Sequence, residues 1–256
     1  MNPMLMENKI VMITGAAQGI GRSIARIAAE LGAKLVLVDI NAEKLDEVVG
    51  ELGSDRARAY TGSVTNTGFV NTTVAAGVQT FGAIHALVNN AGIVRAAMAD
   101  KMEESQWDAV IDVNLKGAFL CLQAVGKHMI ERAKAGDSAP GSIVNISSDA
   151  GRRGTIGQIN YGAAKSGVLG LTMSAAREWG RYGIRVNSAC FGIVETQMTE
   201  TIRSDKFIDK YMAQIPLARI ATPDEAAKPV CFLISDAASY VTGQHLSING
   251  GYHIGF

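Results

Sequence analysis

The residues with the clearest chemical potential are Tyr161 and Lys165, in the stretch QINYGAAKSGVLGL. Positions four apart on a helix lie on one face, so the phenol and the ammonium would lie side by side. A free tyrosine has a pKa of about 10, and proton transfer near pH 7 needs a shift of roughly 3 units, about 4 kcal/mol. A nearby cation favours the phenolate. The pair therefore predicts a tyrosine that exchanges protons with a substrate, its pKa lowered by the lysine.

Two further segments suggest what Tyr161 acts beside. An apolar run, IVNISS, ends at Ser148, thirteen residues before the tyrosine, and IVMITGAAQGIGRSIARIAAE runs from a strand through a glycine-rich turn into a helix. In such a turn Gly15 permits the tight bend, Gly19 lets the backbone approach a pyrophosphate, and Gly21 allows close helix packing, while the helix N-terminus faces the phosphates. These segments predict a dinucleotide site.

Asp39 ends the second apolar run, KLVLVD. A carboxylate there accepts hydrogen bonds from the adenosine ribose hydroxyls and repels a 2′-phosphate. Ile40 follows it, where a basic residue would attract that phosphate. We therefore expect NAD(H) to be preferred over NADP(H). A helix N-cap or turn acid is the structural alternative for Asp39.

Apolar runs alternate with helical stretches along the 256 residues, of which 48% are hydrophobic. Alternation of this kind predicts an α/β fold of Rossmann type, a doubly wound parallel sheet of seven strands with helices on both faces. We expect a single domain over 1–256, with a substrate lid at 193–222 where the alternation is interrupted. The expected strands are 9–14, 34–39, 57–62, 83–90, 142–147, 184–190 and 245–250, and the main helices 20–31, 42–52, 66–81, 104–134, 158–182 and 223–235.

Several motifs follow one another along the chain: Thr14 to Gly21, Asn89 to Gly92, Asn114, Ser148, Tyr161 and Lys165. In the order and spacing of these motifs the chain resembles, from Lys9 to about Tyr252, the short-chain dehydrogenase/reductase family in its single-domain form of about this length. The resemblance implies an NAD(P)-dependent oxidoreductase that transfers a hydride between nicotinamide and a ketone or secondary alcohol.

The resemblance gives four residues catalytic roles. Ser148 would donate a hydrogen bond to the carbonyl oxygen, and Tyr161 would transfer the proton. Lys165 would tune the tyrosine and hold the nicotinamide ribose, and Asn114 would position a water that links the lysine to solvent. Ser147 is the rival of Ser148, but the spacing to the tyrosine favours the second serine.

The resemblance also implies the cofactor contacts. Gln18 supports NAD(H), because family members that use NADP often carry Arg or Lys there. Two positions depart from the family pattern: Ser63 stands where an Asp is usual, and Phe191 precedes Gly192 where a Pro is usual. The residues expected to bind the cofactor are Gly15, Gln18, Gly19, Ile20, Gly21, Asp39, Ser63, Val64, Asn89, Ala91, Gly92, Tyr161, Lys165, Gly192, Val194 and Thr196. A purely structural role is the alternative for Asn89 and Asn90.

The motifs are most similar to the 3-oxoacyl-(acyl-carrier-protein) reductase branch, which implies a 3-oxoacyl thioester substrate and an acidic carrier protein as a partner. Lys127 and Arg181 could meet such a carrier, but Tyr182 stands where a basic residue is often found. That branch typically prefers NADP, which Asp39 opposes. A sugar, polyol or small hydroxy-ketone dehydrogenase is the alternative, and a non-catalytic nucleotide-sensing protein the remote one.

Three arginines suggest an anionic substrate. Arg152 and Arg153 follow Ser148 closely, and Arg95 lies in NNAGIVR. Guanidinium groups form paired hydrogen bonds to carboxylates and phosphates, so we expect one of these side chains to grip an anion at the mouth of the cleft. A solvated loop is the alternative for the adjacent pair.

Composition narrows the functional classes. Lys+Arg and Asp+Glu number 24 each, which gives no broad footprint for nucleic acid or an anionic membrane. Three separated cysteines and four histidines without ligand spacing predict reduced core thiols and no metal site. The N-terminus lacks a targeting pattern, so we expect a cytoplasmic protein. The resemblance also implies a homotetramer held by four-helix contacts. Ala118, Leu122, Met173 and Trp179 are candidates for that surface, and a place in the core is the equal alternative for each.

Overall fold

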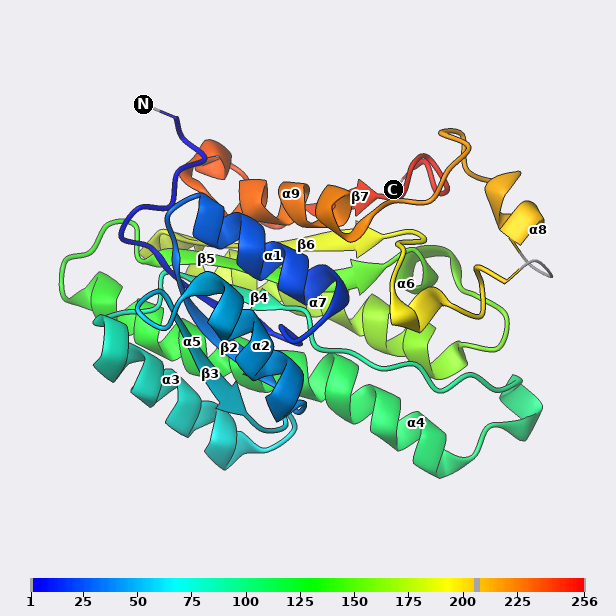
Figure 1. Cartoon of the computed structure of the whole chain (residues 1–256), viewed down its shortest axis with the longest axis horizontal. Coiled ribbons are helices and arrows are strands. Elements are labelled where there is room, and N and C mark those ends of the chain that lie inside the picture. Colours follow the sequence, from blue (N-terminus) through cyan, green and yellow to red (C-terminus); the bar gives the residue numbers. More distant parts are fainter. Residues whose placement is uncertain (1, 205–207, 256) are drawn as a thin grey trace.

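The computed structural model describes residues 2–204 and 208–255, and these residues build one seven-stranded parallel sheet in the order β3-β2-β1-β4-β5-β6-β7 (Figure 1). All five residues of β1 are buried, and so are the four apolar residues in the middle of β2. Such burial is expected of strands in a parallel sheet that is covered on both faces. The predicted fold is confirmed. The strands are β1 Ile10–Thr14, β2 Lys34–Asp39, β3 Ala57–Thr61, β4 Ala86–Asn89, β5 Gly141–Ser148, β6 Ile184–Phe191 and β7 His245–Ile248.

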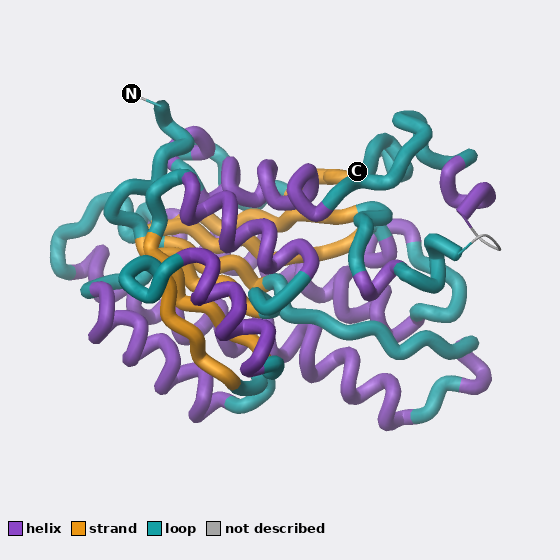
Figure 2. Tube along the Cα trace, viewed as in Figure 1, coloured by secondary structure: helices purple, strands orange, loops and turns teal. Residues whose placement is uncertain are grey.

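Helices cover both faces of this sheet (Figure 2). One hydrophobic cluster joins the sheet to α1, α2 and α9, and a second joins it to α3, α5 and the C-terminal half of α7. The helices are α1 Gly19–Glu30, α2 Ala42–Leu52, α3 Thr67–Phe81, α4 Glu104–Ile111, α5 Gly117–Lys134, α6 Ala150–Arg153, α7 Ile159–Trp179, α8 Ile208–Met212 and α9 Pro223–Ile234.

The strand order reverses direction between β1 and β4, and the loops that leave these two strands are tied together. Thr14 accepts hydrogen bonds at its hydroxyl from the amides of Asn90 and Ala91, both at 3.0 Å. The Asn90 side chain donates back to the carbonyls of Thr14 and Gly15, also at 3.0 Å. A crevice outside the carboxyl ends of strands at such a reversal is where open α/β sheets bind ligands.

The helix predicted over 104–134 contains a break. Residues Asp112–Lys116 form a π-helical segment between α4 and α5. A π-bulge holds one residue more than an α-turn and is frequent at functional sites. By length and composition alone Glu104–Lys134 could cross a membrane, but 44% of its most apolar window is buried in the molecule, and a core helix passes the same test.

The segment predicted as a lid, 193–222, contains a short 3-10 turn, Gln197–Thr199, and the helix α8. The turn is closed by a reciprocal capping arrangement between Thr196 and Thr199. Part of the predicted lid, 205–207, lies outside the described residues.

A neutral histidine lies at the amino ends of β1 and β4, on the side of the sheet opposite the crevice. The Nδ1 atom of His85 accepts a hydrogen bond from the amide of Ile10 at 3.1 Å, which requires an unprotonated nitrogen. Burial, helped by the positive charges of Arg132 and Lys9, lowers the pKa of His85 to about 4.

We predict that His85 makes the protein sensitive to acid. Between pH about 6.5 and about 4 the unfolded chain binds a proton at this histidine and the folded protein does not, so the free energy of unfolding falls as the pH falls through this window. His85→Gln keeps an acceptor for the Ile10 amide and cannot titrate. Urea unfolding between pH 4 and 8 should show a weaker pH dependence for the variant, and parallel curves would contradict the assignment.

Candidate active site

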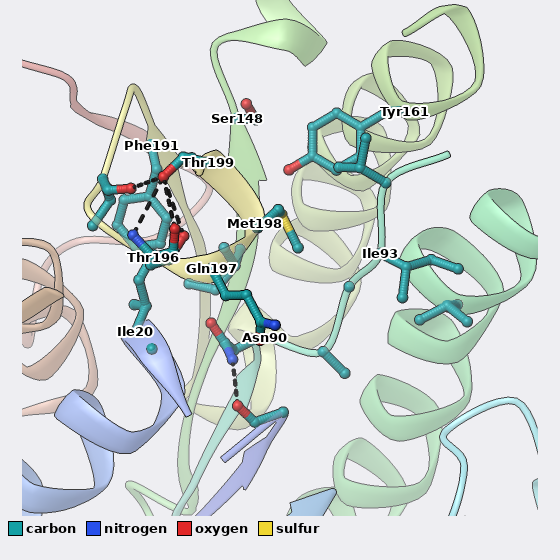
Figure 3. A pocket seen from close by; sticks show the side chains of 18 of the residues that line it. Ile20, Asn90, Ile93, Ser148, Tyr161, Phe191, Thr196, Gln197, Met198 and Thr199 are labelled. Atoms are coloured by element: carbon teal, nitrogen blue, oxygen red, sulfur yellow. Dashed lines mark hydrogen bonds between the residues drawn. The ribbon is translucent and has the colours of Figure 1, made fainter. Parts of the chain in front are cut away.

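A cavity of about 840 Å³ opens at the carboxyl ends of β1, β4, β5 and β6. It extends from the end of β2, where Asp39 lies, past the glycine-rich turn to Ser148 and Tyr161. Figure 3 shows the Ser148 and Tyr161 side chains facing one another across this pocket, with Asn90, Thr196 and Gln197 further along it. The cleft predicted from the strand ends is therefore a continuous pocket in the structure.

The glycine-rich turn has no room for larger residues at two of its positions. Gly15 adopts a φ of +66°, and a Cβ there would lie 2.9 Å from the Cα of Ala91. A Cβ on Gly21 would lie 2.0 Å from the carbonyl oxygen of Gly15, so this glycine lets α1 pack against its own turn rather than line the pocket. Gly19, with a φ of +55°, faces Thr196 across the pocket and leaves the backbone open to a phosphate.

The end of β2 offers a carboxylate and an ammonium together. Asp39 accepts hydrogen bonds from the amides of Ala17 and Asn41, both at 3.0 Å, while Asn41 is the N-cap of α2. Lys44 donates to the Gln18 side chain at 2.8 Å, and both line the pocket with Asp39. Sequence reasoning missed Lys44, because nothing in a helical first turn shows that its side chain reaches back to the glycine-rich loop.

The remaining predicted cofactor residues divide into two groups. Asn89 lies away from the pocket: it is 4% exposed, and its amide donates to the Ala118 carbonyl and to Asn145. It belongs to a strand, so its side chain points between sheet and helix, and Asn90 takes the place at the pocket. The residues that do line the pocket are Ile20, Ser63, Val64, Ala91, Gly92, Gly192, Val194 and Thr196.

The four predicted catalytic residues converge from three elements. Ser148 ends β5, Tyr161 and Lys165 lie on α7, and Asn114 lies in the π-helical segment. The Lys165 ammonium is 5.5 Å from the centre of the tyrosine ring and donates to the Ile146 carbonyl at 2.8 Å. The spacing of four therefore brings the pair together as expected.

The acid–base properties differ from the prediction. Burial raises the pKa of Tyr161 to about 12, with the Ser148 hydroxyl opposing the shift, and burial lowers the pKa of Lys165 to about 8. Desolvation is the largest cause of both shifts, because burial disfavours the charged form of each group, and neither pKa is shifted by the other member of the pair. The phenol is neutral at pH 7, which is the form that donates a proton to a carbonyl oxygen.

One buried polar atom beside Lys165 lacks a partner among the described residues, in a space that adjoins the pocket at Gly92. The Oδ1 atom of Asn114 is buried without a hydrogen-bond partner, while its amide donates to the carbonyls of Ile93 and Val110. A Cβ on Gly92 would lie 2.6 Å from that oxygen and 3.6 Å from the Lys165 ammonium nitrogen, so both groups border the space that this glycine leaves free. An orphaned acceptor beside an ammonium suits the predicted bridging water.

The three arginines predicted to grip an anion do not line the pocket. Arg152 donates to the Ser247 hydroxyl at 2.6 Å, and Arg153 stacks 3.9 Å above the Tyr252 ring and donates to its carbonyl. Arg95 is exposed and donates to the Val94 carbonyl. Arg153 thus meets the pocket only through Tyr252, which lines it, and the grip on an anion stays a prediction.

Comparison with known proteins agrees with this geometry. A family model described as enoyl-(acyl carrier protein) reductase matches residues 15–253. This chain belongs to the short-chain dehydrogenase/reductase family. As a member it is an oxidoreductase that acts on CH–OH or C=O groups with a nicotinamide cofactor.

Individual relatives cover nearly the whole chain. The 3-oxoacyl-(acyl-carrier-protein) reductase FabG of Thermotoga maritima is 43% identical, covering 97% of this chain and 99% of the relative. The acetoacetyl-CoA reductase of a Synechocystis species is 38% identical, covering 97% and 98%. A crystal structure from Sinorhizobium meliloti 1021, assigned as a short-chain alcohol dehydrogenase, superposes with a TM-score of 0.91 at 33% identity, covering 98% of both chains.

Replacing Tyr161 by Phe should abolish turnover in this short-chain dehydrogenase/reductase and leave cofactor binding nearly unchanged. The ring still fills its place, but the hydroxyl that faces Ser148 is lost, and a positioned general acid contributes at least about a hundredfold to the rate. Steady-state kinetics and calorimetric titration with NADH measure the two effects. Near-normal turnover would exclude the tyrosine as proton donor.

Proposed function

We propose that this enzyme reduces 3-oxoacyl thioesters with NADH. The observation that carries the proposal is the Tyr161 phenol beside the Ser148 hydroxyl, in one pocket that also takes in the glycine-rich turn and Asp39. The relatives named as 3-oxoacyl-(acyl-carrier-protein) and acetoacetyl-CoA reductases support the thioester. The nicotinamide cofactor would supply the hydride.

The chain's own residues supply orientation and one proton. Ser148 would donate a hydrogen bond to the ketone oxygen, and Tyr161 would deliver its proton as charge develops there. Lys165, fixed at the Ile146 carbonyl, would stabilise the phenolate left behind. The buried Oδ1 of Asn114 would hold the water through which that proton is replaced.

The pocket offers apolar surface to an acyl chain. Ile93, Val94, Met198 and Ile202 border it, and Tyr211 on α8 adds an aromatic side chain. An acyl chain gains free energy by burying its methylenes against such residues. The same pocket also presents Thr155, Gln158 and Gln197, which can pair with polar groups of a thioester or of a polyol, so the apolar residues are what favour the acyl chain.

The function is tested by offering the purified enzyme acetoacetyl-CoA, crotonyl-CoA, a sugar and a neutral ketone with NADH. We expect oxidation of NADH with acetoacetyl-CoA at a catalytic efficiency at least about tenfold above the other substrates. Reduction of crotonyl-CoA would indicate an enoyl substrate, as the description of the matching family model suggests, and preference for the sugar would replace the thioester by the polyol alternative.

We propose NAD(H) over NADP(H) from the end of β2. Asp39 places a carboxylate there, and the next residue, Ile40, is 74% exposed but has no positive charge that would attract a 2′-phosphate. Lys44 is the opposing influence, because its ammonium, held by Gln18, could turn to a 2′-phosphate. The preference therefore depends on which of the two charges lies nearer the ribose.

Calorimetric titration with NADH and NADPH should show tighter binding of NADH. Asp39→Ala should narrow the difference by about tenfold, because it removes repulsion between like charges, and Lys44→Met should widen it. Ile40→Ala, which changes no charge, is the matched control. Equal affinities in the parent, or a preference for NADPH, would contradict the assignment of Asp39.

We propose a homotetramer assembled through α4, α5 and α7. Trp107, Phe119 and Met173 lie on these helices, 38%, 41% and 46% exposed. Of the other residues predicted for this surface, Ala118 and Leu122 are buried, Leu122 in the cluster that packs on the sheet, and Trp179 is partly buried against the same cluster.

We also propose a single domain with a lid, a cytoplasmic location and an acyl carrier protein as a partner. The chain would act as a single domain over 1–256 in which 193–222 closes over the substrate, supported by the Val194 and Thr196 contacts of that segment with the pocket. A cytoplasmic location is supported by the free, buried cysteines. An acyl carrier protein would be a partner, whereas the balanced charge supports neither nucleic acid nor a membrane as one.

A further inference from the structure

The tail that follows β7 reaches back to the catalytic serine. The side-chain amide of Asn249 donates to both carboxylate oxygens of Asp149, at 3.0 and 2.9 Å, and to the His253 carbonyl at 3.0 Å. Its oxygen accepts the amide of Gly251 at 3.0 Å. Both ends of this one side chain are therefore in use, and they fold the tail onto the residue that follows Ser148.

Asn249 also packs against the loop that leaves β6. A Cβ on Gly192 would lie 2.7 Å from the Cβ of Asn249 and 2.9 Å from its Cα, so the two backbones touch. The Gly192 amide donates to the Ile248 carbonyl at 3.2 Å. One residue thus contacts two of the loops that border the pocket, the loop after β5 and the loop after β6.

Asp149 transmits this contact to Ser148. Its carboxylate belongs to a residue only 3% exposed, so it depends on the hydrogen bonds from Asn249. Its amide donates to the Phe191 carbonyl at 2.9 Å, and the next amide, that of Ala150, donates to the Ser148 hydroxyl oxygen at 3.2 Å. A displacement of Asp149 would therefore change the orientation of the Ser148 hydroxyl.

We propose that Asn249 is a positioning residue which, through Asp149, holds the Ser148 hydroxyl and the Gly192 loop at a fixed separation. The role rests on the proposed function, in which that hydroxyl orients the ketone. It makes the C-terminal tail a part of the active site, although Asn249 itself does not border the main pocket.

The test compares Asn249→Ala with the exchange Asp149→Asn/Asn249→Asp, which restores an amide–carboxylate hydrogen bond in the opposite direction. Asn249→Ala should lower kcat by about tenfold, while the Kd of NADH moves less than about threefold because the glycine-rich turn is untouched. The double variant restores the hydrogen bond between positions 149 and 249 but not the donation to the His253 carbonyl, so it should recover part of the lost activity, on the order of threefold over Asn249→Ala. In a Ser148→Ala background the Asn249→Ala change should cost little, since the hydroxyl it orients is absent.

Amide hydrogen exchange of the substrate-free protein measures the contact between Asn249 and Asp149 independently of catalytic activity. Peptides covering 147–151 and 191–194 should exchange their amide hydrogens faster in Asn249→Ala than in the parent. In the double variant Asp149→Asn/Asn249→Asp their exchange rates should return towards those of the parent. The exchange rates of peptides from β1 and β2 should stay unchanged in both variants. Asn249→Ser, which keeps a small polar side chain packed against Gly192, serves as a second variant if the alanine variant is unstable.

The outcomes separate the two proposals. A parent that reduces no ketone overturns the proposed function, while faster exchange at 147–151 still supports the tail contact. Unchanged exchange overturns the positioning role. Parent-like kcat in Asn249→Ala, or an equal loss in the Ser148→Ala background, overturns it as well and leaves the reductase assignment standing.

Discussion

The structure depends most on how one buried cation is satisfied. The residue Lys165 is 2% exposed, and a buried ammonium is tolerated only with hydrogen-bond partners. The Ile146 carbonyl accepts from the ammonium, and the Ser147 hydroxyl donates to the Lys165 carbonyl, both at 2.8 Å. These two hydrogen bonds join α7 to the C-terminal end of strand β5. Because Tyr161 is one helical turn before the lysine, the same bonds place its phenol opposite Ser148.

Close packing protects that arrangement. A Cβ on Gly151 would lie 2.6 Å from the backbone of Lys165, so α6 lies directly on α7 at the buried cation. The ties between Thr14 and Asn90 fix the other wall of the cleft. The site is thus built from strand ends and helix contacts that leave little freedom, which is the rigidity that a proton transfer over hydrogen-bond distance requires.

The fold could be predicted from the sequence because apolar runs of strand length alternate with helical stretches, and the site because tyrosine, lysine and glycines kept a recognisable spacing. The break at Asp112–Lys116 could not, since it contains neither Pro nor Gly, and helix-forming residues continue on both sides of it. The direction of the Tyr161 shift was missed for another reason: spacing shows which charge is near, but only the packed structure shows how much water is lost.

Side-chain direction was the other gap. Asn89 and Asn90 are neighbours in one motif, yet strand alternation sends the first into the core and the second to the pocket. Arg153 turned onto Tyr252, and Lys44 turned to Gln18, through contacts between residues about 100 and 26 positions apart. Contacts across such separations leave no local pattern in a single sequence.

The π-helical segment has a consequence for how this chain tolerates change in length. Each residue of an α-helix advances the helix by about 100°. The surplus residue in Asp112–Lys116 therefore sets the angular phase between α4, which buries Val110, and α5, which buries Cys121. Deleting one residue would restore regular hydrogen bonding but rotate one helix against the other, exposing one apolar face. The chain has thus exchanged local helical regularity for an inward-facing Asn114.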